Sequence, residues 1–333
     1  MTGLRILLAV MIAAMMATAA QAESRHVKMT VTARTATAAP YFVAIDKGYF
    51  AEQGLDVQIV DAGGGVAIPA LISGSVDFSM SAAVSVGASM RGAGLRVIYT
   101  MADRPPYQLW TIDPAIRTLK DLKGKQIGII SRGDTFEISM RIALRDAGLP
   151  ADWVGYTALG AGTAPRQAAL ASGSLPAIIL SAGDVTPLRS MPFFSKAHMI
   201  VDMEKDIRMP YTGVATSEKL IASDRDVVLR FLRAMVRGVA YMRAFKAETV
   251  AILLKADPAN TKDALDADWD DLIPTLTTDG TASDALIRKD LDVRAAILDI
   301  PADKIPAIDR IYDYGPLREV EAEIKASGWK PTP

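Results

Sequence analysis

Five short stretches carry the residues best suited to binding chemistry, and each lies where a predicted strand leads into a predicted helix. They surround residues 41, 64–66, 81–83, 132–136 and 160–163. In open α/β sheets, ligands bind beyond the carboxyl ends of the strands, where such junctions lie. The helix starts there offer unpaired N–H groups and a positive dipole end, which suit carboxylate, sulfonate or nitrate. The pattern therefore indicates a binding site for a small molecule.

One of these junctions carries charges of both signs. Arg132 is suited to bidentate pairing with a carboxylate, although a solvated surface arginine explains it equally well. Asp134, followed three residues later by Glu137, has the spacing of a capping box at the start of a helix. Because the Asp134 carboxylate would repel an anion, either Arg132 offsets it or the ligand is neutral or amine-bearing there. A small organic anion is the preferred expectation.

Three aromatic side chains, Tyr107, Trp110 and Tyr211, are candidate walls for such a site. Packing in a core or in a hinge explains each of them equally well. Both interpretations stay open at the level of the sequence. If they line the site, they favour an organic ligand with an aromatic or apolar part.

The composition argues against most catalytic and metal chemistry. The chain of 333 residues has no cysteine and two histidines, which excludes disulfides, thiolate catalysis and zinc–cysteine sites. Gly160 and Gly162, with Asp184 further on, match part of a dinucleotide fingerprint, but Pro165 stands where the third glycine belongs. The acidic run 266–271 lacks the glycine and glutamate of an EF-hand loop, so we expect a solvated turn there. We expect no metal and no cofactor, and the net charge of −1 gives no field that favours nucleic acid.

The first 22 residues are typical of an export signal rather than of structure. Arg5 precedes an uncharged apolar run over 6–20, and Ala20-Gln21-Ala22 is an A-x-A cleavage site. A membrane anchor is the alternative, but the run is shorter than the ~20 apolar residues that a span needs. We expect a mature chain that begins at Glu23, is soluble and is exported, most simply to a bacterial periplasm.

The elements that must position the junctions repeat along the chain. Residues 39–82 predict a loop, helix, strand, glycine loop, helix and strand in that order. The segment ALISGSV at 70–76 returns as ALASGSL at 169–175, and each copy precedes an apolar strand that ends in Ser-Ala. A chance match of small residues is the alternative. Together with the chain length, the repeat predicts two lobes of similar build.

The segment PYFVAIDKGYFAEQGLDVQIV at 40–60, followed by GGG and by ALISGSVDFSMSA at 70–82, resembles a known family. It is similar to the substrate-binding proteins of ABC importers of the nitrate, sulfonate and taurine type, with the NMT1/THI5-like proteins, over roughly 27–244. The resemblance implies an α/β fold, the type II periplasmic binding protein fold, with two lobes joined by a two-strand hinge. We assign 23–111 and 213–333 to lobe I and 112–212 to lobe II.

The resemblance also implies which residues meet the ligand. These are Tyr41, Phe42, Gly64, Gly65, Val66, Ser81, Ala82, Thr135, Phe136, Gly162 and Thr163. Trp110, Arg132 and Tyr211 join them as candidates on their own chemistry. The implied function is delivery of a small organic ligand to an inner-membrane ABC permease, by a protein that we expect to be a monomer.

Other functions that share this fold stay open. One is the binding of a thiamine-pyrimidine precursor, and another is a role in a sensor or in a TRAP-like carrier. A fold-related enzyme is the third. The pyrimidine synthases that share this fold are enzymes with a cysteine-rich motif and a reactive histidine. With no cysteine and only His26 and His198, this chain is a poor match for them.

Overall fold

The computed structural model describes residues 24–160 and 163–333, so the expected signal peptide lies outside the described residues. The first sheet has five strands in the order β2-β1-β3-β10-β4. Its members are β1 (Arg25–Val31), β2 (Leu55–Asp61), β3 (Phe78–Ser79), β4 (Leu95–Ala102) and β10 (Thr212–Ser217). β1 pairs in parallel with β2 and β3, whereas β10 runs antiparallel to β3 and β4.

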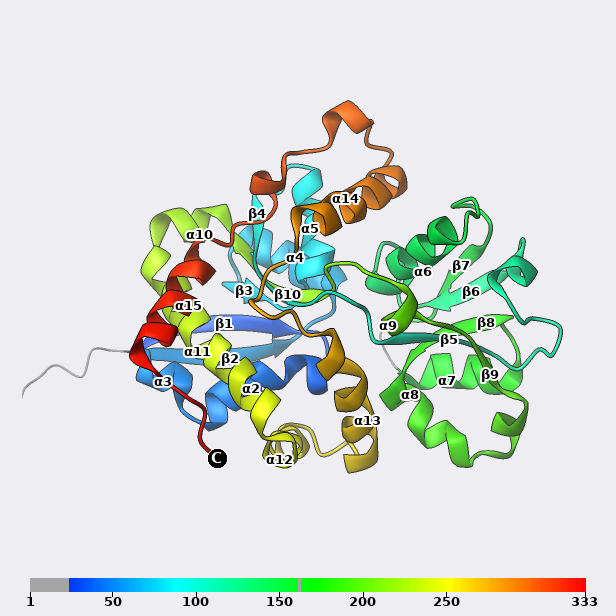
Figure 1. Ribbon diagram of the computed structural model, residues 1–333, viewed down its shortest axis with the longest axis horizontal. Coiled ribbons are helices and arrows are strands. Elements are labelled where there is room, and N and C mark those ends of the chain that lie inside the picture. The colour runs from blue at the N-terminus through cyan, green and yellow to red at the C-terminus, as the bar shows by residue number, and fades with distance from the viewer. Residues whose placement is uncertain (1–23, 161–162) are drawn as a thin grey trace, which may run out of the picture.

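The second sheet repeats this arrangement position by position, in the order β7-β6-β8-β5-β9. Its members are β5 (Tyr107–Thr111), β6 (Gln126–Ile129), β7 (Gly155–Ala158), β8 (Ala177–Ser181) and β9 (His198–Asp202). β6 is parallel to β7 and β8, and β5 is antiparallel to β8 and β9. Figure 1 shows the two sheets side by side, each in its own lobe.

The internal repeat predicted from the sequence is confirmed. Helix α4 (Gly64–Ser73) connects β2 to β3, and helix α7 (Thr163–Ser172) connects β7 to β8 at the equivalent place. After each helix a glycine takes a left-handed conformation, Gly74 with φ 75° and Gly173 with φ 65°. Strand β8 forms in full although Pro176 precedes it. The two-lobe expectation is therefore confirmed.

One boundary between the lobes differs from the expectation. Strand β5, which lies in the range 23–111 that we assigned to lobe I, pairs with β8 and β9 of the second sheet. The chain therefore leaves the first sheet between Ala102 and Tyr107. It returns after helix α9 (Met203–Asp206), just before β10. The error has a physical reason, because the apolar character of a strand does not say which sheet it joins.

The remaining helices cover the two sheets. They are α2 (Ala39–Asp46), α3 (Tyr49–Glu52), α5 (Ala82–Met90), α6 (Thr135–Asp146), α8 (Ala182–Val185), α10 (Glu218–Ser223), α11 (Arg225–Ala244), α12 (Lys246–Ala256), α13 (Lys262–Leu272), α14 (Asp284–Leu298) and α15 (Gly315–Ser327), with 3₁₀ turns η1 (Ala36–Ala38), η2 (Leu119–Leu122), η3 (Thr186–Ser190), η4 (Pro192–Lys196), η5 (Ile273–Thr275), η6 (Ala302–Lys304) and η7 (Ile308–Arg310). Along α11 the apolar stripe is buried as its spacing predicts, with Phe231 and Met235 fully covered. Its cap is Asp224, which accepts from the Val227 N–H.

The C-terminal helices reach from the first lobe to the second. Helix α13 packs against α8, and α14 packs against α6 (Figure 1). Lys289 of α14 pairs with Asp146 of α6 at 2.9 Å, and Val293 of α14 belongs to the apolar core of the second lobe. The lobes therefore touch through these two pairs of helices as well as through the crossing segments. Within the part of the chain that the structure describes, no helix has the length and apolar character needed to cross a membrane.

Candidate functional site

Two helices of the first lobe begin close together without a side-chain cap. The N-cap of α4 is Gly63, and that of α5 is Ser81, whose side chain makes no capping bond. Gly64 allows the approach, because a Cβ at this position would lie 2.9 Å from Cγ1 of Val84 in the first turn of α5. The two starts thus present their N–H groups side by side, with no acidic residue in either first turn.

The backbone bonds show which N–H groups remain for a ligand. The N–H of Val66 donates to the Gly63 carbonyl, so our expectation of Val66 as a main-chain donor is wrong. The residues before it, Gly64 and Gly65, occupy the first two helical positions, whose N–H groups have no partner within a helix. Ala82 is the first helical residue of α5, so its N–H group also has no partner within its helix.

Ser81 adds a side-chain group to these amides. The residue is 6% exposed, and its hydroxyl has no hydrogen-bond partner among the described residues. A buried hydroxyl without a partner costs about 1–3 kcal/mol. The hydroxyl is therefore a candidate ligand contact.

Ser81→Ala is expected to change stability and affinity in opposite directions. The free protein should unfold at the same or a higher temperature, because the variant removes an unpaired buried hydroxyl. Ligand affinity should fall about fivefold to tenfold, the worth of one hydrogen bond. Thermal unfolding and calorimetric titration measure the two effects, and a destabilised free protein with unchanged affinity would reject the assignment.

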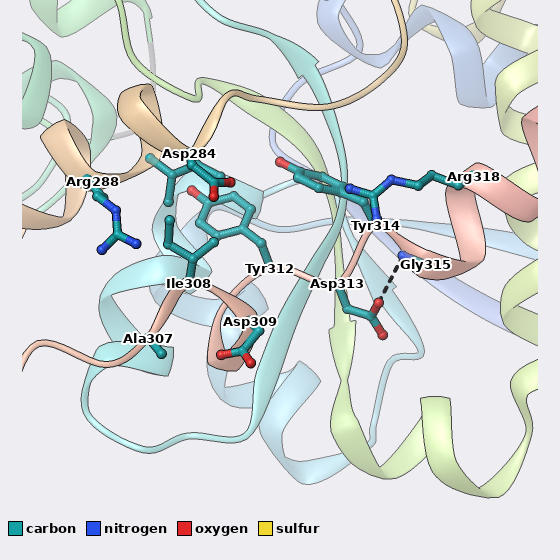
Figure 2. A pocket seen from close by; sticks show the side chains of 11 residues that line it. Asp284, Arg288, Ala307, Ile308, Asp309, Tyr312, Asp313, Tyr314, Gly315 and Arg318 are labelled. Carbon is teal, nitrogen blue, oxygen red and sulfur yellow. Dashed lines mark hydrogen bonds between the residues drawn. The ribbon is translucent and has the colours of Figure 1, made fainter.

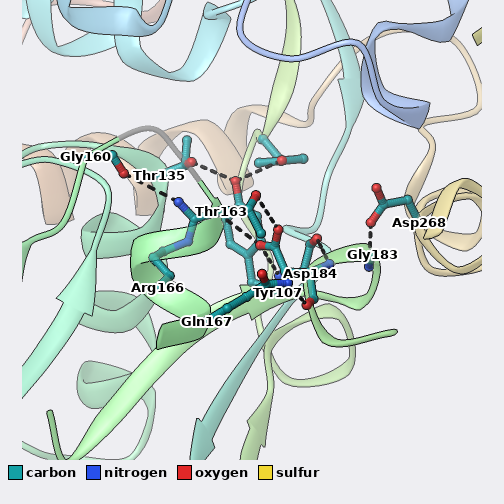
Figure 3. A network of polar contacts seen from close by, with 11 residues as sticks. Tyr107, Thr135, Gly160, Thr163, Arg166, Gln167, Gly183, Asp184 and Asp268 are labelled. Atoms are coloured by element: carbon teal, nitrogen blue, oxygen red, sulfur yellow. Dashed lines mark hydrogen bonds and ion pairs between the residues drawn. The ribbon is translucent and has the colours of Figure 1, made fainter. Parts of the chain in front are cut away.

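The second lobe contributes a chain of hydroxyl groups, drawn in Figure 3. The Tyr107 hydroxyl lies 2.9 Å from Oγ1 of Thr135 and donates to the Tyr211 hydroxyl at 2.8 Å. The ring of Phe136 packs edge-on against Tyr107, with 4.3 Å between the centroids. Burial raises the pKa of both tyrosines, so both stay neutral hydroxyl groups at physiological pH. This part of the wall is polar without being charged.

Some N–H groups around the start of α6 are already bound by side chains of the same helix and its N-cap. Asp134 accepts from the N–H groups of Ser131 at 2.8 Å and Glu137 at 2.9 Å, so the predicted cap is confirmed. The reciprocal bond of a capping box differs, because the Glu137 carboxylate accepts from the Gly133 N–H instead of from that of Asp134. Burial raises the pKa of Asp134, and the bonds from these N–H groups oppose the shift. Arg132 lies 3.2 Å from the Glu137 carboxylate and over the Tyr156 ring. Its guanidinium is engaged within the protein rather than held free for an anion.

A second polar cluster lies at the start of α7. Thr163 donates to Asp184 at 2.8 Å, and Arg166 donates to the other carboxylate oxygen at 3.1 Å (Figure 3). The Arg166 guanidinium lies 5.3 Å from the centre of the Phe136 ring, which joins this cluster to the hydroxyl chain. These bonds account for Asp184 without a nucleotide. Gly162, expected here as a contact, lies outside the described residues.

Two expected contacts have other roles. Tyr41 lies within helix α2 rather than in a loop, is 1% exposed, and donates its hydroxyl to the Gly213 carbonyl at 3.0 Å. Trp110 packs against Phe194 in the core of the second lobe and donates to the Gln108 side chain. Both are buried by neighbouring elements, which periodicity alone did not reveal. Phe42 is nearly buried, with Arg34 over its ring.

The sequence reasoning missed a sixth junction, at the start of α8. Ser181 caps this helix by accepting from the Asp184 N–H. It stands at the position that Ser81 holds in the first lobe, where the Ser81 side chain makes no capping bond. The signal was available, because both copies of the internal repeat end in Ser-Ala. Asp268 of α13 also reaches this junction by accepting from the Gly183 N–H at 2.8 Å. No local pattern predicts that contact.

The other polar candidates are explained by the protein itself. His26 pairs with Asp56, and His198 binds the Ile116 carbonyl, both on strands away from the junctions. The acidic run 266–271 is helical rather than a turn, and its Asp266 pairs with lysines. Within residues 24–160 and 163–333, no group of acidic or histidine side chains is arranged to hold a metal ion.

Two cavities lie apart from the junctions. One, of about 500 Å³, lies between α14 and residues 307–318, and Figure 2 shows Tyr312 and Tyr314 among the residues that line it. The other, of about 510 Å³, lies beside the crossing segments, with Asp103, Arg208 and the start of α14 in its lining. Neither is lined by the helix starts described above.

Each lobe has a five-stranded sheet of the same strand pattern, with β10 antiparallel in the first sheet and β5 antiparallel in the second. This architecture defines the class of two-lobed periplasmic binding proteins. Residues 35–248 match the family described as NMT1/THI5 like. The match covers more than half of the chain, and the chain therefore belongs to that family. The resemblance and the fold class expected from the sequence are confirmed.

Individual known proteins resemble this chain in sequence or in fold. The riboflavin-binding protein RibY of Chloroflexus aurantiacus is 26% identical over 213 residues, which span 61% of this chain and 58% of that protein. A structure from Bordetella bronchiseptica RB50 has a TM-score of 0.75 at 24% identity, covering 91% of this chain and 99% of the other. The alkanesulfonate-binding protein SsuA of Xanthomonas axonopodis pv. citri has a TM-score of 0.69 at 14% identity, covering 89% and 100%. The desulfurization enzyme DSZB, at a TM-score of 0.62, 15% identity and coverage of 90% and 99%, shares the fold, so the fold alone does not separate binders from enzymes.

Proposed function

We propose that this protein is a periplasmic solute-binding protein, which holds a small organic ligand between its lobes and delivers it to an ABC permease of the inner membrane. The observation that carries the proposal is the pair of uncapped helix starts at Gly64 and Ala82, together with the hydroxyl chain of Thr135, Tyr107 and Tyr211. The family and the fold support it. We propose a monomer that is exported and loses residues 1–22.

The two lobes differ in charge, and this difference suggests how the ligand is oriented. The first turns of α4 and α5 contain no acidic residue, whereas α6 begins with Asp134 and Glu137 and α8 with Asp184. An anionic group is stabilised at the first pair and repelled at the second. We therefore place a carboxylate or sulfonate against the first lobe, and the uncharged part of the ligand against the tyrosine hydroxyls.

The test is a thermal-shift screen with sulfonates, carboxylates, riboflavin and pyrimidine precursors, followed by titration of each hit. A true ligand should raise the unfolding temperature in a saturable way, and Thr135→Val should weaken it about tenfold by removing one hydroxyl. Mass spectrometry of the recovered ligand separates binding from turnover. A chemically changed ligand would favour a fold-related enzyme over a binding protein. The lack of any thermal shift across the panel would contradict the ligand classes that we propose.

A further inference from the structure

One contact between the lobes is made by a carboxylate of the C-terminal half. Asp268 of α13 in the first lobe accepts from the Gly183 N–H of α8 in the second lobe at 2.8 Å (Figure 3). One turn further along α13, Asp271 accepts from the Gln108 side chain of β5 at 3.3 Å. These contacts join the lobes at a place apart from the two crossing segments.

A side chain at Gly183 of α8 would displace the Asp268 carboxyl group from its contact. A Cβ added to Gly183 would lie 2.5 Å from Oδ1 of Asp268, well inside van der Waals contact. Gly183 has no left-handed conformation, so its backbone does not itself require glycine. The missing side chain is therefore explained by the approach of α13.

The Asp268 carboxylate lies near other acidic groups in this contact. Asp184 of α8 and Asp271 of α13 face it, and the Tyr211 hydroxyl lies near both Asp268 and Asp184. The cations of the neighbouring elements already have partners. Arg166 pairs with Asp184, and Lys246 of α12 pairs with Asp266 and Asp270. From η3, Arg189 lies near Asp271, and the 3₁₀ turns η1 and η5 bring no charged residue.

Burial between the helices raises the pKa of Asp268 to about 7, and the bond from the Gly183 N–H opposes the shift while repulsion from Asp184 adds to it. When the lobes separate, water reaches the carboxyl group and its pKa returns toward an ordinary value near 4. The closed arrangement therefore binds a proton that the open one releases.

We propose that Asp268 and Gly183 form a latch between the lobes, and that protonation of Asp268 favours the closed arrangement. Because the closed form binds the proton more tightly, closure is favoured at low pH and is weakened as the pH rises through 7. Between pH 6 and pH 8 the ratio of closed to open molecules should fall about tenfold. The proposal rests on the proposed function only in that opening of the lobes admits the ligand.

The experiment measures the distance between the lobes in the ligand-free protein. Because the chain contains no cysteine, Ile72→Cys and Met199→Cys place two unique spin labels on exposed positions of the two lobes. The wild type should shift toward longer distances between pH 6 and pH 8. Asp268→Asn keeps the acceptor without the charge and should stay closed at both pH values. Gly183→Ala should be open at both.

Asp263→Asn, the same substitution at an exposed position of the same helix, is the matched control and should keep the shift of the wild type. A distance distribution that does not change with pH in the wild type would overturn the proposal. So would a shift that persists in Asp268→Asn. Since no ligand is present, this result is independent of whether the ligand classes proposed above are correct.

Discussion

Gly64→Ala is expected to lower ligand affinity about tenfold or more and to destabilise the protein by about 1–3 kcal/mol. The added Cβ would lie 2.9 Å from Val84, whose β-branched side chain cannot turn away easily. The start of α4 must therefore move relative to the start of α5. Two N–H groups that converge on one ligand group lose their geometry, and each such charge-assisted bond contributes about 1.5–3 kcal/mol. Calorimetric titration with a hit from the screen measures the loss.

Gly63→Ala is the matched control for this variant. A Cβ at Gly63 meets no atom within 4 Å, and its φ of −69° suits alanine. The two variants add the same methyl group one residue apart, so only the crowding against Val84 differs. Affinity should be nearly unchanged in the control. Equal losses in both variants would contradict the view that the spacing between α4 and α5 builds the site.

Arg294→Met is expected to destabilise the protein by about 3–5 kcal/mol. Arg294 and Asp290 lie one turn apart on α14, both almost fully buried, with 2.6 Å between Nε and Oδ2. Burial raises the pKa of Asp290, and the arginine opposes that shift. Removing the cation leaves a carboxyl group that is buried without its partner. Because α14 packs on both lobes, chemical denaturation should show the loss for the whole molecule.

The double variant Asp290→Leu/Arg294→Met tests the reason for this loss. Replacing a buried ion pair by apolar side chains of similar size is often close to neutral. The double variant should therefore recover most of the stability that Arg294→Met loses. If the double variant is as unstable as the single one, lost packing rather than an unpaired charge explains the effect.

Much of the fold could be predicted because its signals are local. The spacing of apolar residues in α11, the two copies of the ALxSGS segment and the cap at Asp134 all act within a few residues of one another. The same locality explains why the helix starts at Gly64, Ala82 and Thr135 could be located. Whether they meet a common ligand stays a prediction.

The errors and omissions share a different cause. Tyr41 forms its hydrogen bond with Gly213, and β5 finds its partners β8 and β9, across long stretches of chain. Asp268 meets Gly183 in the same way. Contacts of this kind depend on the packing of whole elements, so the residue types alone did not separate a buried tyrosine from a ligand contact.

Hydrogen exchange of the backbone amides, with and without saturating ligand, tests most directly whether both lobes hold the ligand, the first by the starts of α4 and α5 and the second by the hydroxyl chain that begins at Thr135 of α6. We predict slower exchange in the peptides that cover the first turns of α4, α5 and α6 together. The amides around the cavity between α14 and residues 307–318 should be unaffected. Protection confined to one lobe, or to that cavity, would contradict the account.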